Sequence, residues 1–254
     1  MKTISLWWRG RGFGEPLIMS LVVNILNDNG VDAVLRKHRK VSELVDCPLI
    51  SREATDKTFQ TYAWTYECCS KPIILQYIEY FENVVGKSLK ITRDYIPVKF
   101  YDILEVPSVD IVMGTRTGNW SPYRNWPYFE KLKKLFNKEG ITYIDLDTNG
   151  IRGVECLNYV NKCKLFLGLE TGMSHYVSQF ANGKTLILQS GFSEFEFWAY
   201  LYDYDHLQVE DVPCRPCFIN KQHIARGERK CKLDNICMKN LTVDRVFEAV
   251  TKRI

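Results

Sequence analysis

The sequence lacks a long apolar run. The longest uncharged apolar stretch near its start, Pro16 to Asn27, has 12 residues, whereas a helix needs about 20 to cross a bilayer. No charged segment precedes a long apolar run, so the pattern of a secretory signal is missing too. We therefore expect no membrane span and a cytoplasmic protein, either of a bacterium or, for a phage-encoded chain, of the infected cell.

The sequence also lacks a strong net charge, internal repeats and low-complexity segments. The 34 Lys and Arg residues face 30 Asp and Glu residues, giving +4, and 46% of the chain is apolar. This composition excludes a mainly disordered protein and does not demand nucleic acid as a partner. The first forty residues are nevertheless basic, which fits either a charged surface exposed to solvent or the entrance of an anion-binding site.

The nine cysteines are an odd number, which does not suit a disulfide framework. Cys214, Cys217, Cys231 and Cys237 follow a C-x2-C-x13-C-x5-C pattern. Four thiolates spaced in this way suit a structural tetrahedral metal site, with zinc expected first and iron as the alternative. The other interpretation is a group of buried free thiols.

Strands alternate with helices along the chain, which predicts parallel α/β sheets. A strand over Thr3–Trp8, a helix from Pro16 to Asn29-Gly30 and a strand over Asp32–His38 form one βαβ unit. A strand over Tyr62–Cys69 and a helix over Pro72–Val85 follow less clearly, and the sequence does not indicate a role for residues 49–105.

The alternation of strands and helices resumes in the second half of the chain. The expected strands are Val109–Met113, Ile141–Leu146, Lys164–Leu169 and Thr185–Gln189, and the expected helices are Pro127–Glu139, Val154–Cys163 and Gly172–Ala181. We therefore expect two Rossmann-like domains that face a cleft, over residues 1–105 and 106–254. The first would lie on the acceptor side, and the second would bind a nucleotide and carry the cysteines.

A glycine-bearing turn, Gly12-Phe13-Gly14, follows the first strand and leads into Glu15. Ligands of open α/β sheets bind at the carboxyl ends of strands, where a carboxylate can act as a general base. The third glycine and the ribose-binding acid of the dinucleotide fingerprint are missing. The simpler interpretation is a tight turn with Glu15 in a helical first turn, where the helix dipole favours it.

Two further groups of polar residues follow strands of the second half. Thr115, Thr117 and Arg124 carry hydroxyls and a guanidinium suited to phosphate oxygens. Glu170 ends another strand, where it could accept hydrogen bonds from a ribose, and Thr171, Gly172 and Met173 open a helix whose N–H groups suit an anion. His175 is interpreted as a buried structural donor, and Trp126-Pro127 as packing.

Together, in this order, these motifs resemble those of glycosyltransferase family 9, the bacterial heptosyltransferase group. Glu15 stands where that family has its catalytic Asp, Arg124 where it has a phosphate-binding Lys in K-x-W-P, and Glu170 where it has the Asp of D-[ST]-G-x-x-H. The cysteine segment also resembles a stretch of many members, some of which hold iron. The resemblance covers residues 1–48 and the second half.

The resemblance implies a GT-B fold and inverting transfer of a sugar from a nucleotide-diphosphate sugar, the co-substrate, to a hydroxyl of a lipopolysaccharide-core-type saccharide. Glu15 would be the base, and Thr115, Thr117, Arg124, Glu170, Thr171, Gly172 and Met173 would bind the donor. Further candidate substrate contacts are Arg9, Arg11, Gly12, Gly14 and His175.

Three alternatives stay open at this stage. The acceptor could be a hydroxymethylated cytosine in DNA, as for phage DNA glucosyltransferases, which the basic first forty residues and Trp7-Trp8 would suit. The chain could instead be a non-catalytic zinc-knuckle module that binds nucleic acid through basic residues among the cysteines: Lys221, Arg226, Arg229, Lys230 and Lys232. It could also be a family member that binds a nucleotide without transferring a sugar.

Overall fold

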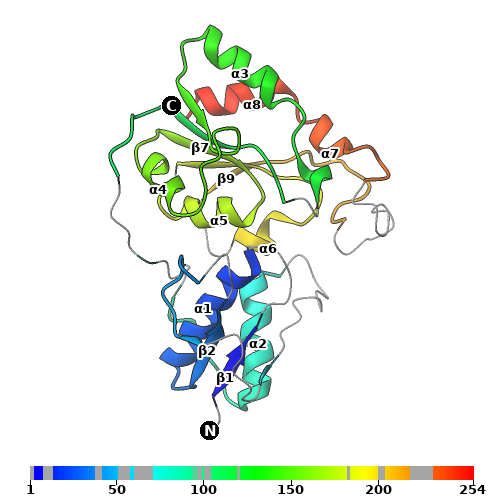
Figure 1. The fold of residues 1–254 in the computed structure, drawn as a ribbon. Helices are drawn as coiled ribbons and strands as arrows, with labels where there is room; N and C mark the ends of the chain where they lie inside the picture. Colours follow the sequence, from blue (N-terminus) through cyan, green and yellow to red (C-terminus); the bar gives the residue numbers. More distant parts are fainter. Residues whose placement is uncertain are drawn as a thin grey trace. The chain divides into compact units, whose positions relative to one another are not determined.

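The computed structural model describes residues 3–7, 14–37, 42–50, 58–59, 71–93, 95, 99, 104–118, 121–181, 184–199, 204–217 and 231–254. The chain forms two compact units, one of residues 1–101 with 196–202 and one of residues 102–195 with 203–254. Each unit contains a sheet of parallel strands (Figure 1). The functional division at residue 105 into an acceptor side and a nucleotide side stays a prediction.

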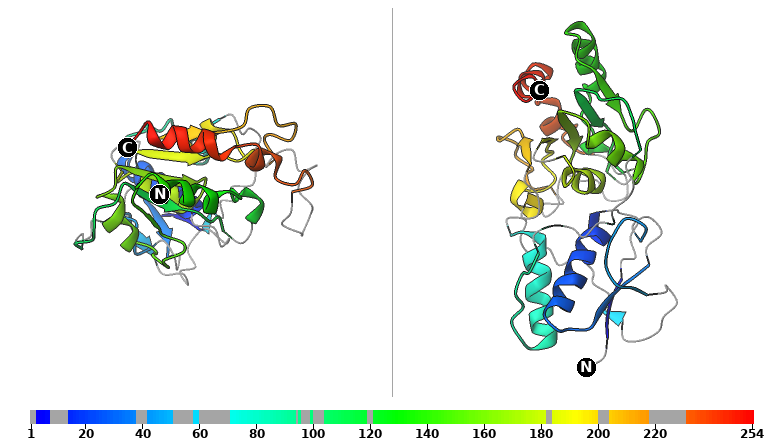
Figure 2. Two further views of the ribbon diagram at one scale, coloured as in Figure 1. Left: turned by 90° about the horizontal axis from the view of Figure 1, so that it is seen from above. Right: turned by 90° about the vertical axis from the view of Figure 1, so that its left-hand side faces the viewer.

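The first unit has a four-stranded parallel sheet in the order β3-β2-β1-β4. Its strands are β1 (Ile4–Leu6), β2 (Ala33–Arg36), β3 (Leu49–Ile50) and β4 (Thr58–Phe59). The two long helices are α1 (Gly14–Asp28) and α2 (Ile73–Val85). Helix α1 contacts both β2 and α2, and the two helices lie side by side (Figure 2).

Helix α1 is buried along almost its whole length, because residues 16–26 are buried on every face. A helix that is apolar all round belongs in a core. It ends before Gly30, whose φ of +70° is accessible to glycine at little cost. The predicted helix and the two flanking strands are thus confirmed, as is the helix at α2, whereas the predicted strand over residues 62–69 lies outside the described residues.

The second unit has a five-stranded parallel sheet in the order β6-β5-β7-β8-β9. Its strands are β5 (Ile111–Gly114), β6 (Tyr143–Asp145), β7 (Leu165–Leu169), β8 (Thr185–Leu188) and β9 (Asp205–Leu207). Its helical segments are η1 (Pro122–Arg124), α3 (Phe129–Lys138), α4 (Glu155–Val160), α5 (Gly172–Ser178), α7 (Ile236–Lys239) and α8 (Val243–Thr251). Helix α6 (Phe195–Ala199) lies where the chain passes between the units.

Strands β7 and β8 are buried at every position, as expected for central strands of a parallel sheet. Helices α3 and α8 pack side by side and share one core with β5, β7 and β8 (Figures 1 and 2). Trp126 joins this core and donates from its indole to the Leu241 carbonyl at 2.8 Å. The four strands and three helices predicted for this half are confirmed, while β9, α7 and α8 were not predicted.

In the described part of the chain, no helix combines the length and the apolar character that crossing a membrane requires.

Candidate functional site

Four neighbouring strands of the second unit end at one edge of the sheet. The register pairs Met113 with Asp145 and Gly114 with Gly168, so β5, β6 and β7 end level with one another. Leu169 pairs with Leu188, which brings the end of β8 to the same edge. Because ligands of open α/β sheets bind beyond the carboxyl ends of the strands, this edge is where the predicted donor residues must be sought.

The structure brings two of the predicted residues together as a buried ion pair. Arg124 Nη1 lies 3.7 Å from Glu170 Oε1, and the two side chains are only 7% and 2% exposed. Arg124 comes from η1, after β5, while Glu170 directly follows β7. The sheet order places β5 beside β7, so residues 46 positions apart meet (170 − 124).

The Arg124 guanidinium has further fixed neighbours. Its Nε donates a hydrogen bond to Ser121 Oγ at 2.9 Å. Its central carbon lies 4.7 Å from the ring centre of Phe192, within the range of a cation–π interaction. A planar guanidinium held on several sides loses little entropy when it binds an anion, which suits recognition of a phosphate group.

The Glu170 carboxylate is held mainly from the loop that follows β8. Ser193 Oγ donates to its Oε1 at 2.7 Å, and Gln189 Nε2 donates to its Oε2 at 3.0 Å. Both donors are themselves about 1% exposed. The carboxylate is therefore a buried anion with a hydrogen bond on each oxygen, and it meets the requirement that a buried charge be both paired and hydrogen-bonded.

Thr115 makes a different set of contacts. Its Oγ1 donates to the Asp145 carboxylate at 2.9 Å, and Lys133 Nζ lies 2.7 Å from the same carboxylate. Burial acts to raise the pKa of Asp145, but hydrogen bonds from Lys133, Thr148 and Thr115 outweigh burial and hold the pKa below its ordinary value. Asp145 thus remains ionised and fixes the start of the loop after β5.

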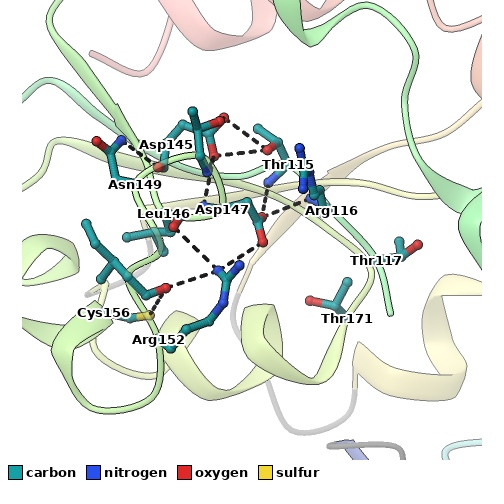
Figure 3. Close-up of polar contacts among 12 residues, drawn as sticks. Thr115, Arg116, Thr117, Asp145, Leu146, Asp147, Asn149, Arg152, Cys156 and Thr171 are labelled. Atoms are coloured by element: carbon teal, nitrogen blue, oxygen red, sulfur yellow. Dashed lines mark hydrogen bonds and ion pairs between the residues drawn. The ribbon is translucent and has the colours of Figure 1, made fainter. Parts of the chain in front are cut away.

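A second carboxylate, Asp147, binds the backbone of the same loop (Figure 3). Its Oδ2 accepts hydrogen bonds from the N–H groups of Thr115 and Arg116 at 2.8 and 2.9 Å, and its Oδ1 lies 3.0 Å from Arg152 Nη1. Consecutive backbone N–H groups that converge on one oxygen form an anion-binding arrangement. Here the chain's own carboxylate occupies that arrangement.

Thr117 lies apart from this network in Figure 3. Its Oγ1 donates to the Ser121 carbonyl at 2.9 Å, and its N–H donates to Asn125 Oδ1 at 2.7 Å. The two bonds connect Thr117 with the start of η1 and with the residue that follows it. Because Ser121 also binds Arg124, Thr117 and Arg124 are connected through one residue.

The start of α5 follows Glu170 directly. Thr171 is its N-cap and accepts a hydrogen bond from the Ser174 N–H at 3.2 Å. Gly168 lies in β7, close to the start of α5. A side chain does not fit at this position, since an added Cβ would lie 2.7 Å from Ser174 Oγ. Thr171, Gly172 and Met173 are partly exposed, so this end of α5 is open to solvent or to a ligand.

His175 lies in the second turn of α5 and is 3% exposed. Burial, together with the nearby positive charge of Arg124, lowers the pKa of His175 to about 3. The imidazole is therefore neutral at physiological pH. A neutral buried imidazole of this kind does not exchange protons near pH 7, which argues against a general acid or base at this position.

Glu15 lies in the first turn of α1 and is partly exposed. Burial and the charge of Glu15 both raise the pKa of the Tyr77 hydroxyl. Gly14 begins the same helix, while the other proposed contacts in this turn, Arg9, Arg11 and Gly12, lie outside the described residues. Glu15 belongs to the first unit and Arg124 to the second.

Some of the four predicted metal-ligating cysteines lie close together. Cys214 Sγ and Cys217 Sγ lie 3.6 Å apart, and the Cys217 N–H donates to the Gly191 carbonyl at 2.9 Å. The Cys237 sulfur is 3.6 Å from the position that a Cβ on Gly191 would take. Burial, followed by the neighbouring thiols of Cys214, Cys237 and Cys231, raises the pKa of the Cys217 thiol.

The described residues contain no group of three or more His, Cys, Asp or Glu side chains arranged to hold a metal ion. The basic residues interleaved with the cysteines at 221–230 lie outside the described part of the chain.

Sequence reasoning missed the partners of the predicted residues: Ser121, Asp145, Asp147, Gln189 and Ser193. Asp145 is the last residue of β6 and Gln189 directly follows β8, at the same edge as Thr115 and Glu170. Their polar character at the end of an apolar run was therefore a usable signal. Ser121 and Ser193 lie in loops and offered no such signal.

No family model matches the sequence, and no curated protein matches it. Several solved structures share its fold over 99% of its length. One is the iron-containing dodecameric glycosyltransferase TibC from enterotoxigenic E. coli H10407, at 8% identity over 75% of that chain and a TM-score of 0.67. TibC is also known in complex with ADP-D-beta-D-heptose.

Two further similar structures match almost end to end. The glycosyltransferase family 9 protein from Veillonella parvula DSM 2008 is 13% identical, with 96% of that chain covered and a TM-score of 0.61. E. coli ADP-heptose LPS heptosyltransferase II is 10% identical, with 98% of that chain covered and a TM-score of 0.58. The resemblance to family 9 and the GT-B fold class are thereby confirmed at the level of the fold.

Proposed function

We propose that the chain is an inverting glycosyltransferase, which transfers a sugar from a nucleotide-diphosphate sugar to a hydroxyl group of a lipopolysaccharide-core-type saccharide. The observation that carries the proposal is the Arg124–Glu170 pair at the carboxyl edge of β5 and β7. A cation held there by several contacts suits a diphosphate group. The shared fold with glycosyltransferases over 99% of the chain supports the same reaction class.

In the proposed reaction, Glu15 takes the proton of the acceptor hydroxyl as the oxygen attacks the anomeric carbon. The bond between that carbon and the diphosphate oxygen breaks on the opposite side, so the configuration inverts. Negative charge develops on the leaving diphosphate, where Arg124 stabilises it. A single carboxylate suffices, because charge stabilisation of the diphosphate replaces the acid that a glycosidase needs.

The other proposed donor residues differ in what they can offer. Thr171, Gly172 and Met173 are partly exposed at the start of α5 and can contact the donor directly. The hydroxyls of Thr115 and Thr117 already donate within the protein, so we assign to them the shaping of the loop around the donor. Arg116, in the same loop, donates its backbone N–H to Asp147 and has an exposed side chain, to which we assign a contact with the ligand.

A saccharide acceptor is preferred to hydroxymethylated DNA. One of the similar structures is an ADP-heptose LPS heptosyltransferase, which supports a sugar acceptor by likeness of fold. A DNA acceptor would make the reaction fall steeply with added salt, whereas a small saccharide would not.

A screen of nucleotide sugars tests the donor. ADP-, UDP-, GDP- and CDP-sugars are added one at a time, and the melting temperature of the chain is measured. The true donor stabilises the folded chain, by about 2.7 kcal/mol at a hundred times its Kd. Release of free sugar from that donor then demonstrates turnover without knowledge of the acceptor. No stabilisation by any nucleotide sugar at millimolar concentration contradicts the proposal.

A structural metal ion at Cys214, Cys217, Cys231 and Cys237 is proposed as well. The separation of 3.6 Å between the sulfurs of Cys214 and Cys217 fits two thiolates on one tetrahedral ion, where about 3.8 Å is expected. TibC, which shares the fold, is iron-containing. The metal would cross-link the loops at 214–217 and 231–237 and take no part in sugar transfer.

Elemental analysis of the purified chain checks the metal. We expect about one zinc or iron ion per chain, and its loss on Cys214→Ser, because a four-thiolate site tolerates no missing ligand well. The matched control is Cys156→Ser, since Cys156 is equally buried but donates to the Ile151 carbonyl instead. A wild-type chain with all four thiols reactive and no metal above background overturns this proposal.

A further inference from the structure

The hydrogen bonds that fix Glu170 come from residues to which the proposed chemistry gives no role. Gln189 Nε2 and Ser193 Oγ donate to the two carboxylate oxygens at 3.0 and 2.7 Å. Arg124 Nη1, at 3.7 Å, lies within the range of a charge interaction but beyond that of a hydrogen bond. Residues on the β8 side thus donate a hydrogen bond to each carboxylate oxygen, and Arg124 supplies the opposite charge.

Gln189 is itself firmly placed. Its backbone N–H donates to the Leu207 carbonyl at 2.8 Å, which joins it to β9. Its side-chain amide also donates to the Ser193 carbonyl at 3.2 Å, which closes the loop between the two residues. A carboxylate held by such a loop has one orientation rather than several, because the amide and the hydroxyl cannot both follow it elsewhere.

The length of the acid matters for this arrangement. Glutamate at position 170 extends one methylene further than the aspartate of the motif that it resembles. That extra length lets the carboxylate lie in the β8 loop at 2% exposure. An anion so enclosed acts on a ligand through its neighbour, and the neighbour of opposite charge is Arg124.

We propose that Gln189 and Ser193 are positioning residues, which hold Glu170 as the fixed counter-ion that orients Arg124 toward the donor diphosphate. This inference rests on the proposed function, since it assigns to Arg124 the diphosphate of a nucleotide sugar. It adds two residues from β8 and its loop to the site. It also makes Glu170 a residue that acts through Arg124.

The test compares binding of ligands with and without the diphosphate. Gln189→Met and Ser193→Ala remove the two hydrogen bonds while keeping most of the side-chain volume. Calorimetry with ADP, UDP, GDP and CDP, and with adenosine, uridine, guanosine and cytidine, gives Kd for each variant. We expect the diphosphate that binds wild type to bind each variant about tenfold more weakly, as for the loss of one hydrogen bond to a charged group. Affinity for the nucleoside should change less than twofold.

The loop after β8 and the end of β9 provide matched controls. Ser190 is as buried as Ser193, but its hydroxyl accepts from the Phe192 N–H, and Gln208 is a buried glutamine whose amide donates to the Ser190 carbonyl. Ser190→Ala and Gln208→Met therefore make equal deletions without touching Glu170. Both should keep diphosphate affinity within about twofold of wild type. A loss as large in the controls as in the test variants contradicts a specific role.

A pH profile separates positioning from general damage. In Gln189→Glu the new carboxyl faces Glu170, and like charges at this distance raise the pKa of one of them. Near pH 5 the new carboxyl is protonated and donates a hydrogen bond as the amide did, so affinity relative to wild type is restored. As the pH rises through this raised pKa, toward about pH 9 for a buried carboxyl, it ionises, and the ratio should fall by about tenfold or more. A ratio that does not vary with pH overturns the proposal.

These measurements distinguish failure of the proposed function from failure of the positioning role alone. If wild type binds none of the four diphosphates, the proposed function and this inference fall together. If wild type binds one of them and Gln189→Met and Ser193→Ala bind it equally well, only the inference fails.

Discussion

Replacing Glu15 by Gln is expected to lower the rate of sugar transfer by about 10²–10⁴-fold, the usual contribution of a general base. The amide keeps the size of the side chain but cannot take the proton of the acceptor hydroxyl. Glu15 lies in the first turn of α1, where its side chain is partly exposed and its charge acts on the Tyr77 hydroxyl. Its replacement should therefore leave the fold intact.

The measurement is initial-rate kinetics with the donor found by the screen, combined with the Kd of the corresponding nucleoside diphosphate. That Kd should stay within about twofold, because the base acts on the acceptor. The matched control is Glu79→Gln, which removes an exposed carboxylate of α2 in the same unit and should transfer at the wild-type rate. Transfer by the Glu15 variant within tenfold of wild type would exclude Glu15 as the base.

The second large effect is expected on stability. Arg124→Met removes the cation 3.7 Å from the Glu170 carboxylate, which is 2% exposed. Breaking a buried ion pair by deleting one partner typically costs about 3–5 kcal/mol, because the remaining charge stays buried without its opposite charge. The lost contact with Phe192 adds a smaller penalty. We expect a decrease of about 3–5 kcal/mol in the free energy of unfolding, measured by urea denaturation.

A double-mutant cycle shows whether the charge is the cause. Glu170→Gln is close in shape and leaves no anion to be compensated. Combined with Arg124→Met, it should recover about half or more of the lost stability, because replacing both members of a buried pair costs far less than deleting one. Strictly additive losses in the double variant would mean that the two charges do not interact. Arg124 and Glu170 would then not act as an ion pair in the candidate site.

The elements that could be predicted are those with a clear local pattern. Helix α1 follows from its apolar run and from Asn29-Gly30, and α2 follows from the spacing of Ile73, Tyr77 and Phe81. Strands β3 and β4 have two residues each, too few for any periodicity. Helix α8 was missed although its signals are present: Thr242 caps it, and Val246 and Val250 are buried on one face.

The candidate site divides in the same way. Arg124 and Glu170 could be predicted because each follows a strand and carries a charge suited to phosphate or ribose chemistry. Their pairing could not, since it depends on β5 lying beside β7 in a strand order that local patterns do not encode. The same holds for Glu170 and Gln189, which meet only because β7 pairs with β8 in a register that aligns Leu169 with Leu188. Side-chain partners across strands are long-range information.

The short segment of residues 196–202 belongs with the first unit although the chain around it builds the second. The polypeptide therefore crosses between the units three times, after residues 101, 195 and 202. Neither unit is a continuous stretch of the gene. A fragment that ends near residue 105 would lack residues 196–202, which belong to its unit. Expressing the two units separately would therefore require a relinked, permuted chain rather than a simple truncation.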